Sequence, residues 1–161
     1  DWSSDVCSSD LTGFSAVTNP SLTRILTSDG TAHGAIAESG FTYDSTNKVV
    51  RVQGTEYMQS VNLSGLVVGT NLVQKITVSS GTSTVMDYYV VDTTNGSARS
   101  GQVMVVWDGS GVQYTDLSTP DLNGPTTAFV FQAVISGSFM AIEGVVSAGT
   151  WDVKAATRVV F

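Results

Sequence analysis

Short apolar segments recur at intervals of about ten residues along most of this chain, and residues that favour turns separate them. The pattern starts near Met58, and the segments predicted to be strands are 58–67, 72–79, 84–91, 98–107, 112–116, 127–135, 138–147 and 150–160. Regularly spaced short strands with turn signals between them are typical of β-sandwiches and barrels. Eight strands of this length can enclose a core between two sheets. We therefore predict an all-β fold, an antiparallel β-sandwich of jelly-roll-like form.

Side-chain alternation is clearest in the last of these segments. Apolar residues occupy alternate positions at Trp151, Val153, Ala155 and Val159, and mostly polar residues lie between them. Successive side chains of a strand point to opposite faces, so this pattern indicates a strand with one buried and one solvated face. No stretch of the chain shows convincing helical periodicity.

The predicted strands are joined by sequences that favour tight turns. Asn95-Gly96 lies between two apolar runs, which is among the strongest short-range signals for a hairpin. Asp108-Gly109-Ser110-Gly111 predicts a second hairpin. Ser136-Gly137-Ser138 and Ala148-Gly149 separate the last three strands, because glycine permits the positive φ that tight turns require. These three strands are therefore expected to be consecutive and antiparallel.

The N-terminal part of the chain has a weaker pattern. Residues 12–40 are mostly Ser, Thr, Gly and Ala, with one short candidate strand at 22–26, so we expect little structure there. The segment 40–54 predicts a hairpin, with a turn at 44–47 whose Asp and Asn side chains bond nearby backbone groups.

The first eleven residues, DWSSDVCSSDL, differ from the rest. The three aspartates lack the alternate spacing of a calcium loop, and Cys7, the only cysteine, has no second cysteine or basic neighbour for redox chemistry. The string resembles the conceptual translation of a common sequencing adapter, as in a gene taken from a metagenomic read. We therefore treat residues 1–11 as non-native, with the native part beginning near Thr12. Removing three aspartates changes the net charge from −7 to −4.

Charge and hydropathy exclude two classes of partner. The chain has seven basic and fourteen acidic residues, and no cluster of Lys or Arg could bind phosphates. We therefore expect no nucleic-acid partner. No apolar run approaches the roughly 20 residues that cross a bilayer, so we expect no membrane insertion.

Candidate catalytic and metal-binding residues are few. His33 is the only histidine, and we expect it to be an exposed or packing residue. Without a native cysteine, Cys/His zinc sites and histidine-based triads are nearly excluded. We predict no cofactor and no metal site.

Carboxylates leave two alternatives open. Glycoside cleavage needs two carboxyl groups about 5 to 10 Å apart, and the same groups could instead hold a structural calcium ion. The candidates are Asp87, Asp92, Asp108, Asp116, Asp121, Glu143 and Asp152. Most lie at predicted turns, where aspartate is favoured for backbone reasons. We therefore predict no enzymatic activity and name no catalytic residue.

Three aromatic residues could form a platform for sugar rings. Trp107 is in phase with Val103 and Val105, and Trp151 is in phase with Val153, so we expect both indoles in the core. Tyr114 lies in a short strand beside a glycine-rich turn. It is our candidate for a ligand-facing aromatic.

The region from about Met86 to the C-terminus resembles a C-terminal domain of bacteriophage tail-fibre and related virion proteins. The domain's pattern is matched in order and spacing by MDYYVV at 86–91, ARSGQVMVVWDG at 98–109, DLSTPDLNG at 116–124 and SAGTWDVKAATRVV at 147–160. The resemblance implies structural roles for Asp87, Tyr88, Arg99, Gly101, Trp107, Asp121, Trp151 and Arg158. For the two arginines we expect bonds to strand-end carbonyls or to an aspartate. The chain departs from the pattern at Met86 and at Asn123-Gly124-Pro125, and the second departure affects the loop near Asp121.

The hairpin at 40–54 is similar to the short stalk repeat of such fibres. We therefore divide the chain into a stalk-like or linker segment, 12–56, and a sandwich domain, 57–161. A stalk of two short strands cannot bury an apolar face alone, so self-association, as the homotrimer common in such fibres, is expected.

The resemblance implies a function in recognition and assembly. We expect a tail-fibre C-terminal domain that takes part in host attachment, assembled in the host cytoplasm and carried on the virion, with a host surface glycan or protein as its other partner. One alternative is capsid decoration or another structural role in the virion. The other is a carbohydrate-binding or depolymerising module.

Overall fold

The chain divides into two compact units, Asp1–Gly54 and Thr55–Phe161. The computed structural model describes residues 16–18, 24–28, 34–46, 49–52, 55–108 and 110–160. The predictions for residues 1–11, with Cys7, and for His33 lie outside the described residues. The same holds for Asn47 and Gly54 of the predicted hairpin.

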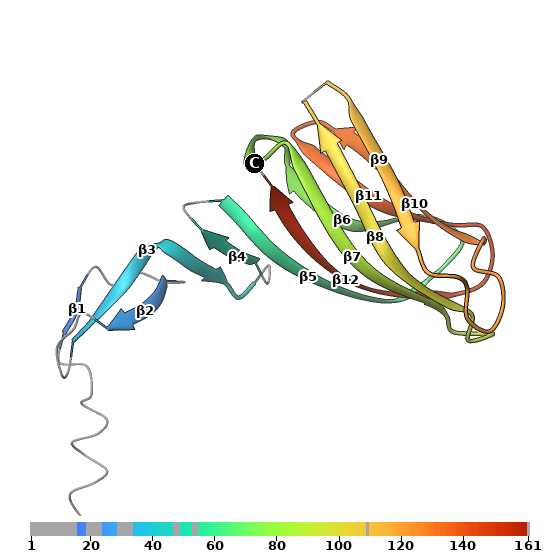
Figure 1. The fold of residues 1–161 in the computed structure, drawn as a ribbon, viewed down its shortest axis with the longest axis horizontal. Coiled ribbons are helices and arrows are strands. Elements are labelled where there is room, and N and C mark those ends of the chain that lie inside the picture. Colours follow the sequence, from blue (N-terminus) through green and yellow to red (C-terminus); the bar gives the residue numbers. More distant parts are fainter. Residues whose placement is uncertain are drawn as a thin grey trace, which may run out of the picture. The chain divides into compact units, whose positions relative to one another are not determined.

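The first unit is a small sheet built around one long strand (Figure 1). The strands are β1 (Ala16–Thr18), β2 (Arg24–Ser28), β3 (Gly34–Asp44) and β4 (Val49–Val52). β3 pairs antiparallel with β2 and β4 and parallel with β1. The small sheet therefore depends on β3.

The predicted hairpin at 40–54 is confirmed. Phe41 pairs with Val52, and Asp44 pairs with Val49 at the turn. The Asp44 carboxylate accepts a hydrogen bond from the backbone N–H of Thr46 at 3.0 Å. It also forms an ion pair with Arg51 at 3.5 Å. One aspartate thus stabilises the turn and joins the two strands.

The described residues before residue 40 contain more strand structure than the single short strand predicted from the sequence. β3 begins at Gly34, β2 lies at 24–28 rather than 22–26, and β1 adds a third pairing. Ala35 and Ala37 are buried at alternate positions of β3. These small side chains give no strong apolar pattern in the sequence, although they pair with β2, the preceding strand.

All eight strands predicted for the second unit are present. They are β5 (Thr55–Leu66), β6 (Gly69–Thr77), β7 (Ser83–Asp92), β8 (Ala98–Trp107), β9 (Val112–Ser118), β10 (Phe129–Ser136), β11 (Phe139–Val146) and β12 (Trp151–Val160). A 3-10 turn, Val78–Ser80, follows β6. No helix in the described part of the chain is long and apolar enough to cross a membrane.

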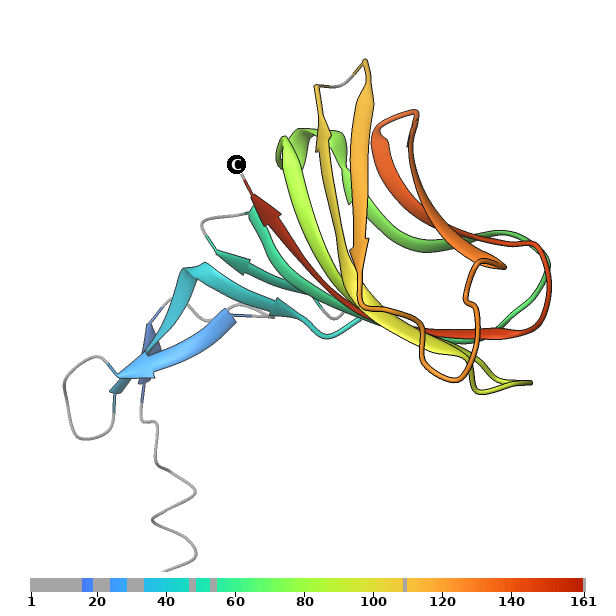
Figure 2. The same ribbon diagram turned by 45° about the vertical axis from the view of Figure 1, so that its right-hand side comes forward.

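These eight strands form two antiparallel sheets, which confirms the predicted fold class. One sheet has the order β5-β12-β7-β8-β9, and the other has the order β10-β11-β6. Figure 2 shows the smaller sheet facing the larger one. The pairs β5·β12 and β6·β11 are nested as in a jelly roll. β7, β8 and β9 instead form a meander within one sheet.

The core lies between the two sheets and is built from alternate residues of each strand. Phe129 is at its centre, with ring centroids 5.0 Å from Phe131 and 5.5 Å from Trp151. Gly144 on β11 leaves room for this ring, because a Cβ there would lie 2.6 Å from Cζ of Phe129. Burial of large apolar side chains from both sheets is the main source of stability.

Candidate functional site

A buried polar cluster surrounds Arg99 on the inner face of the larger sheet. Arg99 pairs with Val90 on β7, and its side chain is only 8% exposed. Its Nη1 donates to the carbonyl oxygens of Thr126 at 3.0 Å and Phe129 at 3.1 Å, and to Oγ1 of Thr126 at 2.7 Å. Its Nη2 lies 3.5 Å from the Asp116 carboxylate. One guanidinium therefore joins β8, β9, the β9–β10 loop and the first residue of β10.

Tyr88 extends this cluster from β7. Its hydroxyl donates to Oδ1 of Asp116 at 2.6 Å and accepts from Nε of Arg99 at 3.2 Å. Burial raises the pKa of Tyr88, and the hydrogen bond to the Asp116 carboxylate adds to this effect. The phenol therefore stays neutral and continues to donate at physiological pH.

Gly101 lies directly opposite Tyr88 in the sheet and leaves space for its hydroxyl. A Cβ at residue 101 would lie 2.2 Å from the carbonyl oxygen of Leu117 and 2.8 Å from Oη of Tyr88. Any side chain here would push β9 away from β8 or displace the phenol. This position requires glycine for space rather than for backbone freedom.

Asp121 organises the loop that crosses from β9 to the second sheet. Its carboxylate accepts from the backbone N–H of Thr126 at 2.8 Å and from Oγ1 of the same residue at 2.5 Å. These two bonds, with the charge of Arg99, lower the pKa of Asp121. Asn123 adopts a φ of 62° and Gly124 a φ of 137°. This is the segment in which the sequence departs from the tail-fibre pattern, and these two residue types tolerate such backbone angles.

The cluster brings together four of the eight residues singled out from the sequence. Tyr88, Arg99 and Asp121 come from three separated segments and share one connected hydrogen-bond network, and Gly101 leaves the space for the Tyr88 hydroxyl. Its polar groups bond to each other and to backbone carbonyls. The cluster therefore connects the larger sheet to the smaller one through hydrogen bonds of Arg99.

The other four residues lie elsewhere. Trp107 and Trp151 are buried, and their indole N–H groups donate to the carbonyl oxygens of Val78 at 3.2 Å and Ala148 at 2.8 Å. Asp87 and Arg158 are about half exposed and form an ion pair at 3.5 Å on the outer face of the larger sheet.

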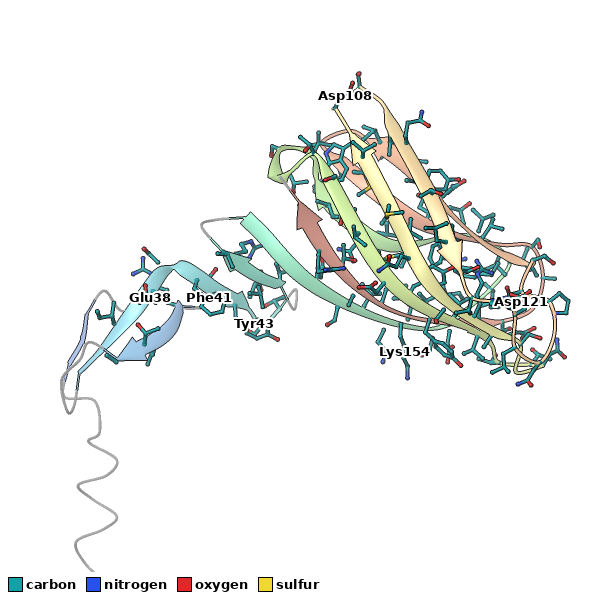
Figure 3. All side chains as sticks on the ribbon, in the orientation of Figure 1. Glu38, Phe41, Tyr43, Asp108, Asp121 and Lys154 are labelled. Carbon is teal, nitrogen blue, oxygen red and sulfur yellow. The ribbon has the colours of Figure 1, made fainter. Side chains whose placement is uncertain are left out.

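The turn aspartates bond to the N–H groups of their own turns. Asp92 accepts from the backbone N–H of Thr94 at 2.8 Å, and Asp108 accepts from those of Ser110 at 3.0 Å and Gly111 at 2.8 Å. These backbone bonds are the main reason that the pKa values of Asp92 and Asp108 are lowered. Figure 3 shows Asp108 and Asp121 at separate ends of the second unit. The carboxylates of Asp92 and Asp108 therefore stabilise their own turns by accepting backbone hydrogen bonds.

Glu143 and Asp152, two further acidic candidates, also accept hydrogen bonds. Glu143 accepts from the side-chain amide of Gln132 at 2.7 Å, and Asp152 accepts from the backbone N–H of Gly65 at 2.8 Å. Among the described residues, no three acidic, histidine or cysteine side chains are grouped so that they could hold a metal ion.

Among the described side chains of the second unit, Tyr89 and Tyr114 are exposed on the larger sheet. Tyr114, the candidate ligand-facing aromatic, lies on the edge strand β9 and is 44% exposed. Tyr89, which the sequence analysis missed, lies on β7 and is 42% exposed. It could have been found, because it directly follows Tyr88 in a strand, and neighbouring residues of a strand point to opposite faces.

The outer face of the larger sheet has two shallow depressions. One, of about 400 Å³, is lined mainly by apolar side chains that include Val85, Met104 and Val106. The other, of about 460 Å³, includes Asn62, Asp87, Tyr89, Lys154 and Ala156.

Comparisons with known proteins find similarity among solved structures only. No family model matches the sequence, and no curated protein matches it. The tailspike protein of Acinetobacter baumannii phage AM24 has a TM-score of 0.39 and 13% identity, over 63% of this chain and 25% of that one. The Acinetobacter phage vB_ApiP_P1 tailspike has a TM-score of 0.42 and 15% identity, over 81% and 29%.

A third similar structure is tailspike gp49 of A. baumannii bacteriophage Fri1, described as a capsular polysaccharide depolymerase. It has a TM-score of 0.37 and 17% identity, over 73% of this chain and 19% of that one. The chain therefore spans between 19% and 29% of the length of these three tailspikes.

Proposed function

We propose that this chain is a structural and recognition part of a phage virion, the C-terminal domain of a tail fibre with the end of its stalk. The observation that carries the proposal is the Arg99 cluster. Tyr88, Arg99, Gly101 and Asp121 belong to the separated segments through which the sequence resembles tail-fibre domains, and they converge on one network. Residues of the tail-fibre pattern that meet in one cluster support the proposal more strongly than the matched spacing of the pattern alone.

The proposal includes a homotrimer. On the β3–β4 hairpin, Phe41, Tyr43 and Val52 are each 40% exposed. Phe41 and Tyr43, labelled in Figure 3, are two residues apart on β3 and therefore share a face. Val52 lies directly opposite Phe41 and belongs to the same face. A small sheet with large apolar side chains in water would gain stability by packing against copies of itself.

Light scattering on the full chain tests the trimer. We expect a mass three times that of the 16.8 kDa chain. A mass that stays monomeric at high concentration would contradict it.

We propose that the domain acts by contact rather than catalysis. What supports this is geometry: Asp92 and Asp108 accept hydrogen bonds from the backbone of their own turns, and Asp121 accepts from Thr126. A reducing-end assay on capsular polysaccharides tests this part. The release of new ends by the purified chain would favour the depolymerising alternative, an activity attributed to gp49 of phage Fri1.

Recovery of the complete gene and its neighbours tests the virion role. A tail-fibre gene is expected beside baseplate and lysis genes, with upstream stalk repeats. A position beside the major capsid gene would instead favour capsid decoration, and a position outside any phage region would overturn the proposal.

A further inference from the structure

The outer face of the larger sheet carries an exposed aromatic side chain, Tyr89, that is flanked by polar side chains. The register places Lys154 of β12 directly opposite Tyr89 of β7, and it places Asn62 of β5 opposite Lys154. Side chains that are directly opposite each other in antiparallel strands have Cβ atoms about 5 Å apart. Asn62, Lys154 and Tyr89 thus form a continuous row across three strands.

The next row of side chains, Ser60, Ala156 and Asp87, explains why the surface is lower beside Tyr89. Ala156 lies opposite Ser60 on one side and Asp87 on the other. The small Ala156 side chain lowers the surface beside Tyr89 and Lys154, and all three residues line the depression of about 460 Å³. Figure 3 shows Lys154 pointing away from the smaller sheet. Tyr89 therefore lines a hollow that Asn62, Asp87 and Lys154 also line.

At this site the acidic side chain has hydrogen-bond and ion-pair partners, whereas the basic side chain has none among the described residues. Asp87 pairs with Arg158 at 3.5 Å and accepts from Gln102 at 2.6 Å. Asp152, two residues before Lys154, accepts a hydrogen bond from the backbone N–H of Gly65. Within the described residues, neither Asn62 nor Lys154 makes a side-chain hydrogen bond or ion pair. The charged group of the depression that is available to bind a ligand is therefore the Lys154 ammonium.

We propose that Tyr89, Lys154 and Asn62 form a binding site for a carboxylated polysaccharide. A sugar ring stacks on the Tyr89 face, because flat aromatic faces with polar edges suit carbohydrate rings. The Lys154 ammonium pairs with the sugar carboxylate, and the Asn62 amide bonds to a hydroxyl. This inference deepens the proposed function, on which it rests, because it names the class of surface molecule and the face that recognises it.

Binding of the full chain to a panel of soluble polysaccharides tests the site. The acidic probes are polygalacturonate, hyaluronan and alginate, and dextran is the neutral probe, measured by calorimetry at 0.15 M salt. We expect at least one acidic probe to bind more tightly than dextran. Tyr89→Thr keeps a residue that favours strands and should weaken that binding by about tenfold or more. Lys154→Met should remove the preference for the acidic probe over dextran.

Val130→Thr is the control, because it replaces a side chain of similar exposure on β10, outside this depression. It should leave binding unchanged. The site is overturned if no acidic probe binds better than dextran, if Tyr89→Thr binds as well as the original chain, or if Val130→Thr weakens binding equally.

These outcomes separate the site from the proposed function. A gene placed among baseplate genes, with no effect of Tyr89→Thr on binding, would remove the site and leave the virion role. Acidic polysaccharide binding that depends on Tyr89, from a gene outside any phage region, would keep the site and remove the virion role.

Discussion

Arg99 shows how one buried charge can hold two sheets together. Its donors bond to a phenol, a hydroxyl, two carbonyl oxygens and a carboxylate that belong to both sheets and the loop between them. Burying a guanidinium is costly unless its donors are satisfied. The satisfied network therefore favours the arrangement in which β7, β8, β9 and the 119–128 loop are all in place.

Arg99→Met should destabilise the second unit strongly. It removes the donor to the Tyr88 hydroxyl and to the Phe129 carbonyl oxygen, and the cation that faces Asp116. Breaking a fully buried pair costs about 3–5 kcal/mol. We expect a loss at or below the lower end of this range, because Asp116 is partly exposed and keeps its bond from Tyr88. Denaturant unfolding of the full chain measures this loss. Arg158→Met is the control, because its half-exposed ion pair with Asp87 contributes only about 0–1 kcal/mol. Equal losses in the two variants would contradict the role given to Arg99.

Gly101→Ala should destabilise the packing of β9 on β8. The added Cβ would lie 2.2 Å from the Leu117 carbonyl oxygen, and relief requires a backbone shift that costs about 1–3 kcal/mol or more. Hydrogen exchange should be faster at the β9 amides. Gly111→Ala is the control, since the nearest atom to its Cβ is Oδ1 of Asp108 at 3.8 Å. An unchanged exchange rate at β9 would show that the space is not needed.

Asp121→Asn should make the protein less sensitive to acid. The folded pKa of Asp121 lies below its ordinary value of 3.8, so the unfolded chain takes up this proton first as the pH falls. The contribution of Asp121 to stability is present above pH 3.8 and is lost below it, as the pH falls through the folded pKa. Chemical unfolding between pH 2 and 7 measures the effect. The variant should be less stable at pH 7 and lose less stability on acidification, and an unchanged acid slope would contradict this.

At the scale of elements, the turns decide which strands become neighbours. The β7–β8 hairpin turns at Asn95-Gly96, with Gly96 at a φ of 72° and its N–H bonded to the Asp92 carbonyl at 2.8 Å. The Asp92 carboxylate accepts from the backbone of Thr94 and the side chain of Asn95. A backbone angle that favours glycine is thus combined with a side-chain cap.

Gly96→Ala should cost about 1–2 kcal/mol, the penalty for a side chain in left-handed backbone. No atom lies within 4 Å of the added Cβ, so the effect isolates backbone strain. Thermal unfolding measures it. Gly96→Asn is the matched variant and should lose less, since asparagine tolerates this region. Equal losses would show that the strain is not the cause.

At the scale of the whole molecule, the exposed hairpin side chains bear on assembly. Joint replacement of Phe41 and Tyr43 by Ser should shift the mass in solution from trimer towards monomer, because it removes apolar area from the proposed contact. Sedimentation over a range of concentrations measures the shift. Val106→Ser, which removes a 54% exposed side chain from the second unit, should leave the mass unchanged. A trimer that survives the double replacement would place the contact elsewhere.

The sequence alone determined the strands of the second unit and their turns. Period-two alternation and turn residues are local signals, and the eight predicted segments match β5 to β12. The first half of β3 was missed, because Ala35 and Ala37 carry little apolar surface and therefore give no clear period-two pattern. The resemblance singled out Tyr88, Arg99, Gly101 and Asp121 but could not supply Asp116 or Thr126 as their partners.

Only the tertiary structure decided which strands pair and what meets inside. β12 lies between β5 and β7, which are far from it in sequence, and this register places Lys154 beside Tyr89 and Asn62. Pairing across such distances depends on how the whole core closes rather than on local preference. For the same reason the partners of Arg99 and the hollow beside Tyr89 become visible only once the sheets are assembled.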